Sequence, residues 1–178
     1  MTEQVEESLR DLWAAVGPPS TGVALACVGS LARRELGPRS DLDLVLLHDG
    51  RPLGTGGGLD ALSERLWYPL WDARVKMDHS VRTPAECTAV AVREVSAGVG
   101  LLDLRVVAGD AALVGATRTA LLTAWRTNAR RRLPELLESL EELQVSNARR
   151  QGWSWEQIAV QLHVSRQAVH KKYRRHGF

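Results

Sequence analysis

Two aspartates separated by one residue have the clearest chemical meaning in this sequence. Asp41 and Asp43 stand at the start of an apolar run. If that run is a β-strand, its side chains alternate between two faces, so both carboxylates point to the same side. Carboxylates this close repel each other unless a positive charge lies between them, and the usual one is a divalent metal ion. The Asp-x-Asp pair therefore predicts a metal site.

A Gly-Ser pair precedes the aspartates, at the end of another apolar run. Gly29 and Ser30 predict a turn whose backbone N–H groups are available to a phosphate. A metal ion beside a phosphate-binding turn is what phosphoryl and nucleotidyl transfer require. The residue types alone therefore indicate chemistry on a phosphorylated substrate.

The composition is that of an ordinary globular chain. It has 178 residues, of which 44% are hydrophobic and 25% charged, enough for one domain and a small appendage. No run approaches the roughly 18 apolar residues of a membrane span, and the acidic N-terminus has no signal core, so we expect a cytoplasmic protein without membrane contact. Cys27 and Cys87 lack metal-ligand spacing and are expected to be reduced core thiols, which disfavours zinc.

The hydrophobic spacing predicts the elements that must position these residues. Apolar residues recur at helical spacing from Thr2 to Val16, and Gly17-Pro18 ends that helix. Thr83, Pro84 and Glu86 form a capping box with proline at the first helical position. The Gly-rich loop at 49–58 lacks a P-loop ending and is expected to be a connection. We expect strands at 23–28, 41–48 and 75–81, and further helices at 32–36, 59–71, 84–97, 101–108 and 110–132.

The C-terminal part differs in charge from the rest. Residues 126–178 hold 11 Lys or Arg and 5 Glu, a net charge of +6, whereas the preceding residues carry −4. A basic tail suggests a polyanionic partner. Leu133-Pro134 marks the expected boundary between a domain at 1–132 and one at 133–178. The leucine stripe that follows either pairs two copies or packs on the preceding domain; it comprises Leu136, Leu137, Leu140 and Leu143.

Several ordered segments resemble a known family. Gly29-Ser30 followed by Ser40-Asp41-Leu42-Asp43 resembles the nucleotidyltransferase superfamily of DNA polymerase beta. Further matches resemble the nucleotidyltransferase domain of bacterial PII uridylyltransferases. They are Arg33, Glu35, Pro38 and Ser40, then Tyr68–Ala73, His79–Thr83 and Leu101–Asp110.

The resemblance implies a small mixed α/β sheet with flanking helices, two Mg²⁺ ions and a nucleoside triphosphate. It implies that Asp41 and Asp43 bind the metals, and that Gly29 and Ser30 hold the β- and γ-phosphates. A third carboxylate would also bind metal and act as general base. Asp78, on the strand expected at 75–81, is the candidate, with Asp72 as the alternative.

Other residues of these segments have less specific interpretations. Arg33 either pairs with Glu35 or Asp41, or binds the triphosphate, and Ser40 joins the candidate nucleotide-binding residues. His79 is expected to pack on the apolar face of its strand. Ser30-Leu31-Ala32 resembles the turn of smaller stand-alone nucleotidyltransferases, which include antitoxins.

The segment Trp153–Tyr173 resembles a bacterial helix-turn-helix. Ser154 is expected to cap its first helix with Gln157 in a capping box, and Val164 to pack under the turn. His163 occupies the turn position where glycine is usual because φ is often positive. The expected DNA-binding residues are Ser165, Arg166, Gln167, His170, Lys171 and Arg174. The alternative is an all-helical hairpin with a basic surface that binds nothing.

These features predict a metal-dependent enzyme that transfers a nucleoside monophosphate from UTP or ATP to a hydroxyl of a protein or small molecule. A DNA-binding tail would be attached to it. Two alternatives stay open at this point: a non-catalytic regulator that senses a nucleotide, and an antitoxin-like enzyme that modifies a toxin partner. A palindromic DNA site would imply a homodimer.

Overall fold

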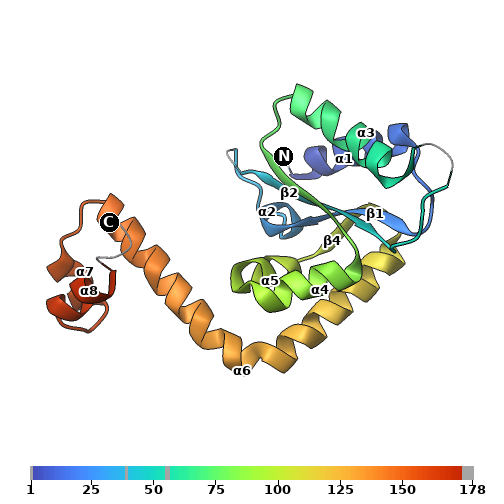
Figure 1. Cartoon of the computed structure of the whole chain (residues 1–178). Coiled ribbons are helices and arrows are strands. Elements are labelled where there is room, and N and C mark those ends of the chain that lie inside the picture. The colour runs from blue at the N-terminus through green and yellow to red at the C-terminus, as the bar shows by residue number, and fades with distance from the viewer. Residues whose placement is uncertain (1, 39, 55–56, 174–178) are drawn as a thin grey trace. The chain divides into compact units, whose positions relative to one another are not determined.

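A computed structural model describes residues 2–38, 40–54 and 57–173 of the chain. Figure 1 shows the elements in chain order. They are α1 (Thr2–Val16), β1 (Val23–Val28), α2 (Gly29–Ala32), β2 (Leu42–His48), α3 (Gly58–Asp72), β3 (Met77–Arg82), α4 (Pro84–Arg93), α5 (Val95–Leu102), β4 (Arg105–Gly109), α6 (Ala111–Arg150), α7 (Trp155–Gln161) and α8 (Arg166–Tyr173).

The strands form one four-stranded mixed sheet with the order β3-β2-β1-β4. β1 pairs antiparallel with both β2 and β4, while β2 and β3 are parallel. A parallel pair requires a crossover connection, which α3 provides. β1 and β2 are the inner strands. The connection between them, which contains α2 and Asp41, therefore lies where the two central strands meet at one end of the sheet.

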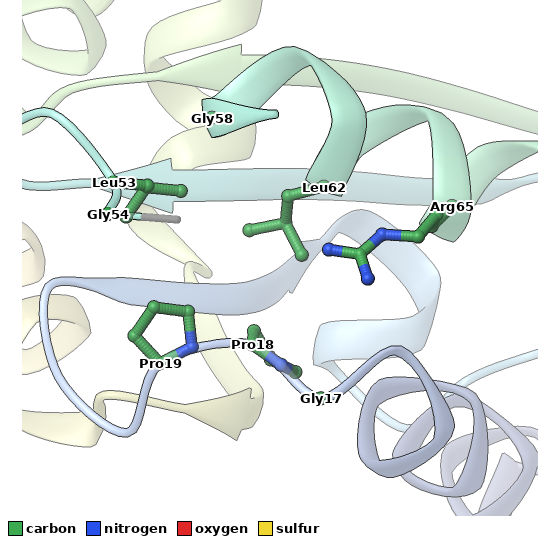
Figure 2. Close-up of a pocket in the computed structure, with 8 residues that line it drawn as sticks. All are labelled: Gly17, Pro18, Pro19, Leu53, Gly54, Gly58, Leu62 and Arg65. Carbon is green, nitrogen blue, oxygen red and sulfur yellow. The ribbon is translucent and has the colours of Figure 1, made fainter. Parts of the chain in front are cut away.

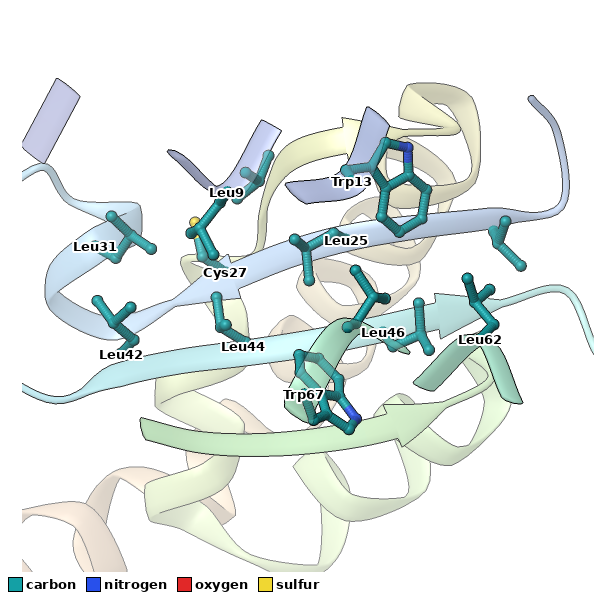
Figure 3. Close-up of a cluster of buried hydrophobic side chains, with 13 residues drawn as sticks. Leu9, Trp13, Leu25, Cys27, Leu31, Leu42, Leu44, Leu46, Leu62 and Trp67 are labelled. Carbon is teal, nitrogen blue, oxygen red and sulfur yellow. The ribbon is translucent and has the colours of Figure 1, made fainter. Parts of the chain in front are cut away.

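Helices cover both faces of the sheet (Figure 1). α1 and α3 pack on one face through Leu9, Leu62 and Trp67, against Leu44 and Leu46 of β2 (Figure 3). On the opposite face a second apolar cluster joins the sheet to α4, α5 and the first part of α6. This α/β arrangement confirms the expected fold class.

The alternation along β2 follows the predicted pattern. Leu42, Leu44 and Leu46 belong to the cluster under α1 and α3, whereas Val45 and Leu47 belong to the other cluster. Asp43 therefore lies on the face covered by α4 and α5. The sequence-based prediction that the leucines and the aspartates occupy opposite faces is confirmed for Asp43, whereas Asp41 precedes the strand.

Two predicted helices are wrong. The helix expected at 32–36 is instead α2, which spans Gly29–Ala32. The segment expected to be helical at 101–108 contains the end of α5 and then strand β4, which pairs with β1. A short apolar run fits a buried helix or a buried strand equally well, and here pairing with β1 decides the outcome.

The helix expected at 84–97 has the predicted capping box but ends at Arg93. Glu94 is extended, with φ −120° and ψ 115°, and α5 follows directly. The two helices then approach closely, because a Cβ atom at Gly98 would lie 2.6 Å from the Ala91 carbonyl oxygen. The break thus lets a small residue pack against the backbone of the preceding helix.

The chain divides into two compact units, residues 1–128 and 129–178. The helix expected to end at residue 132 instead continues through Pro134, since α6 spans Ala111–Arg150. In the second unit, α6, α7 and α8 bury a small cluster that includes Val145, Ile158 and Tyr173. The C-terminal region is therefore helical, as expected.

Candidate active site and candidate nucleic-acid interface

The sheet register brings Asp43 and Asp78 side by side. The two residues are direct partners in the parallel β2–β3 pair, so their side chains share one face of the sheet. Val28 is the partner of Asp43 on the other side, which places the Gly29-Ser30 turn next to the carboxylates. The prediction that 75–81 carries a strand holds with shifted bounds, since β3 spans Met77–Arg82.

Gly29 is fixed by its closeness to Asp43. Its φ is +62°, a left-handed conformation that favours glycine, and a Cβ atom there would collide with Asp43 Oδ2. Only glycine therefore allows the turn and this carboxylate to approach each other so closely.

The environment of Asp43 disfavours its charged form. Its pKa is raised, first by burial and then by the negative charges of Asp78 and Asp41, while the positive charge of Arg33 opposes the shift. Asp78, Asp41 and Arg33 are thus all close enough to Asp43 for their charges to act on its carboxylate.

Asp41 is already paired with a cation of the protein. The Nζ atom of Lys76 lies 2.9 Å from Asp41 Oδ1. The two side chains are 80% and 46% exposed, so the pair contributes little to stability. Within the described residues no three His, Cys, Asp or Glu side chains form a group that could hold a metal ion, and the Asp41–Lys76 pair shows where one of the expected ligands is directed instead.

A cavity of about 400 Å³ lies beside the carboxylates. Asp43 and Asp78 line it from the sheet, Gly29 from the turn, and Gly100 and Leu101 from α5. The cavity is large enough for part of a small-molecule substrate. It is also well placed for one, because it lies next to both the Gly29 turn and the carboxylates.

The structure separates the two candidates for the third carboxylate. Asp78 lies beside Asp43, whereas Asp72 is the last residue of α3, which covers the opposite face. His79 is also on that opposite face, where its ring packs 5.0 Å from Trp67 and 5.3 Å from Trp71. Ser40 closes a turn, because its hydroxyl accepts a hydrogen bond of 2.9 Å from the Gly37 N–H.

Arg33 forms ion pairs with two carboxylates. Its Nε donates to Glu35 at 2.9 Å, as one interpretation predicted, and its Nη1 donates to Asp103 at 2.7 Å. The second partner is thus Asp103 and not Asp41. Sequence reasoning missed both Lys76 and Asp103, and only the membership of Asp103 in the matching segment Leu101–Asp110 pointed to it.

A second pocket, of about 300 Å³, lies between the end of α1 and the start of α3. Figure 2 shows Leu62 and Arg65 of α3 facing Pro18 and Pro19 across it. The Nη1 atom of Arg65 donates to the Val16 carbonyl at 3.2 Å. Its described lining contains no carboxylate, so the pocket lacks the groups that metal-assisted transfer would need.

In the C-terminal unit, the ends of α7 and α8 follow the predictions. Ser154 and Gln157 form the expected capping box, and the hydroxyl of Ser165 accepts a hydrogen bond from the Ala168 N–H at 3.2 Å. His163 has the expected positive φ of 54°. Val164 does not pack under the turn, since it is 47% exposed.

The candidate DNA-binding side chains gather on the outer side of α8. Arg166, Gln167, His170 and Lys171 are exposed, while Val169 and Tyr173 are buried. A hollow of about 390 Å³ is lined by Ser165 and three of these residues. The ring of His170 also contacts Trp155 edge-on at 5.6 Å. Arg174, the remaining candidate, lies outside the described residues.

Comparison with known proteins gives the family of the first unit. The family described as "Nucleotidyltransferase domain" matches residues 3–99. This chain belongs to the nucleotidyltransferase domain family. The Gly29 turn and the carboxylates Asp41, Asp43 and Asp78 lie within the matched part of this nucleotidyltransferase.

Curated relatives of this nucleotidyltransferase are named "Bifunctional uridylyltransferase/uridylyl-removing enzyme". The protein from Streptomyces coelicolor is 45% identical over 152 residues, or 85% of this chain and 17% of its own length. That of Corynebacterium glutamicum is 50% identical over 105 residues, or 59% of this chain and 14% of its own length. This nucleotidyltransferase thus matches less than a fifth of the length of either relative.

One solved structure similar to this nucleotidyltransferase is described as "Crystal structure of the toxin-antitoxin with AMP-PNP". It has a TM-score of 0.44 and 12% sequence identity, and the match covers 76% of this chain and 98% of that one. Among the described residues, none of the helices combines the length and the apolar character needed to span a membrane.

Proposed function

We propose that this protein transfers a nucleoside monophosphate from UTP or ATP to a hydroxyl of a protein or small molecule. The placement of Asp43 and Asp78 on paired strands, beside the Gly29 turn, is the observation that carries the proposal. The matched nucleotidyltransferase family supports it. UTP is the first candidate donor, because the relatives are named uridylyltransferases.

The residues present fit divalent metal ions. Asp41, Asp43 and Asp78 supply the hard oxygen donors that Mg²⁺ prefers. Burial, and then the negative charges of Asp78 and Asp41, raise the pKa of Asp43, so a cation bound beside Asp43 would relieve the repulsion between these carboxylates. These three carboxylates would hold two Mg²⁺ ions. When bound, such ions neutralise the charge that develops on the phosphates and on the oxygens involved in transfer.

In the proposed reaction an acceptor hydroxyl oxygen forms a bond to the α-phosphorus of the nucleotide. The bond between that phosphorus and the α–β bridging oxygen breaks, and pyrophosphate leaves. Asp78 accepts the hydroxyl proton as general base. Gly29 and Ser30 hold the β- and γ-phosphates through backbone N–H groups. Arg33, beside that turn, offers the same phosphates the N–H groups that bind no other described residue.

Transfer of label tests this function. The full chain is incubated with Mg²⁺, cell lysate and UTP, ATP, CTP or GTP carrying label on the α-phosphate. The Asp41→Asn/Asp43→Asn double variant is compared with the wild type, and Asp78→Asn with Asp72→Asn. We expect label on one species. The rate of label transfer should fall at least 1,000-fold in the double variant and in Asp78→Asn, and should change little in Asp72→Asn. Removing a metal ligand or a base removes several kcal/mol of transition-state stabilisation, and each tenfold in rate corresponds to about 1.4 kcal/mol.

The labelled species identifies the acceptor. Label on one small protein would support modification of a partner such as a toxin, whereas a small labelled product would indicate a metabolite. If the protein binds nucleotide but transfers nothing, the non-catalytic regulator replaces the enzyme as the better hypothesis. Transfer that survives in the double variant would show that the carboxylates are assigned wrongly.

We propose further that the C-terminal unit binds DNA through α8. The exposed polar side chains of this helix lie opposite its buried residues Val169 and Tyr173, and residues 126–178 carry a net charge of +6. Arg166 and Gln167, in the first turn, would read base edges, and Lys171 would contact phosphate. Lys172 has a different role, because it pairs with Glu141 at 3.1 Å.

Selection of bound sequences from a random DNA pool tests this second function. The Arg166→Ala/Gln167→Ala variant should lose about 1–3 kcal/mol per base contact on the selected site. The Lys171→Ala variant should instead weaken binding to all sequences and reduce the salt slope by about 1. Equal affinity of the wild type and the double variant for the selected site would refute recognition by α8.

A palindromic site would require two copies of the chain, and we propose that α6 pairs them. Leu137, Leu140 and Leu143 are 65%, 47% and 60% exposed. Leu136, Leu140 and Leu143 follow one another at the four- and three-residue spacing of a helix-pairing seam. Sedimentation of the wild type and of a Leu137→Glu/Leu140→Glu variant measures this association. A wild type that stays monomeric when bound to its selected site would refute it.

A further inference from the structure

The segment Leu101–Asp110 has no assigned task in the proposed reaction. It follows the carboxylates by many residues, and neither Asp103 nor Arg105 lines the cavity beside Asp43. Both charged side chains nevertheless reach back to the turn between β1 and β2. Their partners are Leu31, Ala32 and Arg33, the residues that directly follow Gly29 and Ser30. These contacts indicate what the segment does.

Arg105 holds the end of α2. Its Nη2 donates to the Leu31 carbonyl at 2.9 Å, and its Nε donates to the Ala32 carbonyl at 3.0 Å. The last carbonyl groups of a helix have no partner within the helix, so Arg105 supplies partners for the end of this four-residue helix. The contacts span more than 70 positions of sequence and therefore fix the turn to β4.

Arg105 is itself held by a buried carboxylate. Glu6 on α1 is 3% exposed and lies 2.5 Å from Arg105 Nη2. Burial acts to raise the pKa of Glu6, but the hydrogen bonds and charges of Arg105 and then Arg10 outweigh it and lower the pKa. Glu6 therefore stays ionised and keeps the guanidinium of Arg105 in one position against the turn.

Asp103 holds Arg33. The Asp103 carboxylate accepts from Arg33 Nη1 at 2.7 Å, and Glu35 accepts from Arg33 Nε at 2.9 Å. These bonds use two nitrogens, and the Arg33 Nη2 atom has no partner among the residues that the structure describes. The charge of Arg33 acts on Asp43, so the unused N–H groups belong to a guanidinium near the carboxylate site.

We propose that Asp103 and Arg105 are positioning residues for the nucleotide. Arg105 fixes the backbone of the Gly29–Ala32 turn, and Asp103 fixes the Arg33 side chain so that its free N–H groups meet the triphosphate. The inference rests on the proposed nucleotidyl transfer for its ligand. A turn and a guanidinium that are already in place lose less conformational entropy when the triphosphate binds.

Two measurements on the full chain test this assignment, and the first needs no nucleotide. Hydrogen exchange is followed on a peptide covering residues 29–36, where the Arg33 and Glu35 N–H groups donate to the Gly29 and Ser30 carbonyls. We expect exchange at least tenfold faster in Arg105→Met and about threefold faster in Asp103→Asn. A peptide from α3 should exchange as in the wild type. Unchanged exchange at 29–36 in both variants would overturn the proposal.

The second measurement is calorimetric binding of the α,β-methylene analogues of UTP and ATP with Mg²⁺, which cannot transfer their nucleotidyl group. Asp103→Asn should bind the preferred analogue about three- to tenfold more weakly, with an unchanged melting temperature, since both Arg33 and Asp103 are at least one-third exposed. Asp11→Asn, which removes an exposed carboxylate of α1, is the matched control. Arg10→Gln is the control for Arg105, because it removes a partner of Glu6 but touches no residue of the turn.

The outcomes separate this inference from the proposed function. Binding by Asp103→Asn equal to the wild type, or weakened to the same degree in the controls, overturns the positioning role. Tighter binding by Asp103→Asn also overturns it, since Asp103 would then compete with the triphosphate for Arg33. If the wild type binds neither analogue while exchange at 29–36 responds as expected, Arg105 does fix the backbone of the Gly29–Ala32 turn, but the proposed function and the nucleotide-positioning role are both refuted.

Discussion

The buried carboxylate of Glu6 offers a quantitative test of how this fold is held together. Glu6 accepts hydrogen bonds from Arg105 and from Arg10, the latter at 2.8 Å. The variant Glu6→Gln keeps the shape of the side chain but removes its charge. We expect it to destabilise the first unit at neutral pH, because it leaves the Arg105 guanidinium without a counter-charge in a largely dry site.

The size of the effect follows from burial. Removing one partner of a fully buried ion pair costs about 3–5 kcal/mol. The Glu6 side chain is only 4% exposed, but that of Arg105 is 26% exposed, and it keeps two backbone carbonyls as acceptors. The free energy of unfolding should therefore fall by about 2–3 kcal/mol, below the range for a fully buried pair.

The pH dependence gives a second signature. The folded-state pKa of Glu6 lies below its ordinary value of 4.5, so its ionised form stabilises the folded protein above that value. This contribution is lost as the pH falls through the lowered folded-state pKa. The difference in stability between wild type and Glu6→Gln should be full at pH 7 and shrink below pH 4.5.

Urea unfolding at several pH values, followed by tryptophan fluorescence, measures both effects. Glu7→Gln is the control, since Glu7 is the exposed neighbour of Glu6 and its substitution should stay within about 0.5 kcal/mol. A Glu6→Gln protein as stable as the wild type at pH 7, or a difference that grows as the pH falls, would refute the reasoning.

Three further substitutions or titrations follow from local geometry. Gly29→Ala introduces a Cβ that collides with Asp43 Oδ2 in a left-handed conformation, so calorimetry should show at least a tenfold loss of nucleotide affinity. The raised pKa of Asp43 means that protons compete with Mg²⁺ at a higher pH than at an ordinary aspartate near 3.9; carboxyl NMR should show this pKa falling in Asp78→Asn. His163 has a φ of 54°, so the His163→Gly variant should be more stable than the wild type by about 0.5–1 kcal/mol in thermal unfolding.

The part of the site that could be predicted from sequence is the part with short-range patterns. The spacing of Asp41 and Asp43 specifies a strand with one acidic end, and the Gly29-Ser30 turn lies close to it in the chain. The strand β3 followed from alternation of side chains, and Asp78 was chosen on it because the resemblance implies a third carboxylate. Each of these predictions needs only residues within one element or one turn.

The interactions that sequence reasoning missed join distant parts of the chain. Glu6 and Arg105 are 99 residues apart, and Arg33 and Asp103 are 70 apart. No local pattern encodes such a pair. The wrong helix at 101–108 has the same origin, because β4 is a strand only through its pairing with β1, and a short apolar run carries no period that distinguishes the two conformations.

The strand order has a consequence for how such a protein can change its target. β1 and β2, which carry the Gly29 turn and Asp43, are the inner strands, whereas β3, which carries Asp78, is at an edge of the sheet. Substitutions near the turn disturb strands paired on both sides, but the outer side of β3 has no strand partner among the described residues. In the proposed reaction, the nucleotide donor would thus bind at the centre of the sheet, while Asp78, the proposed base, would meet the acceptor at its periphery. Evolution could then exchange one acceptor for another without rebuilding the nucleotide site.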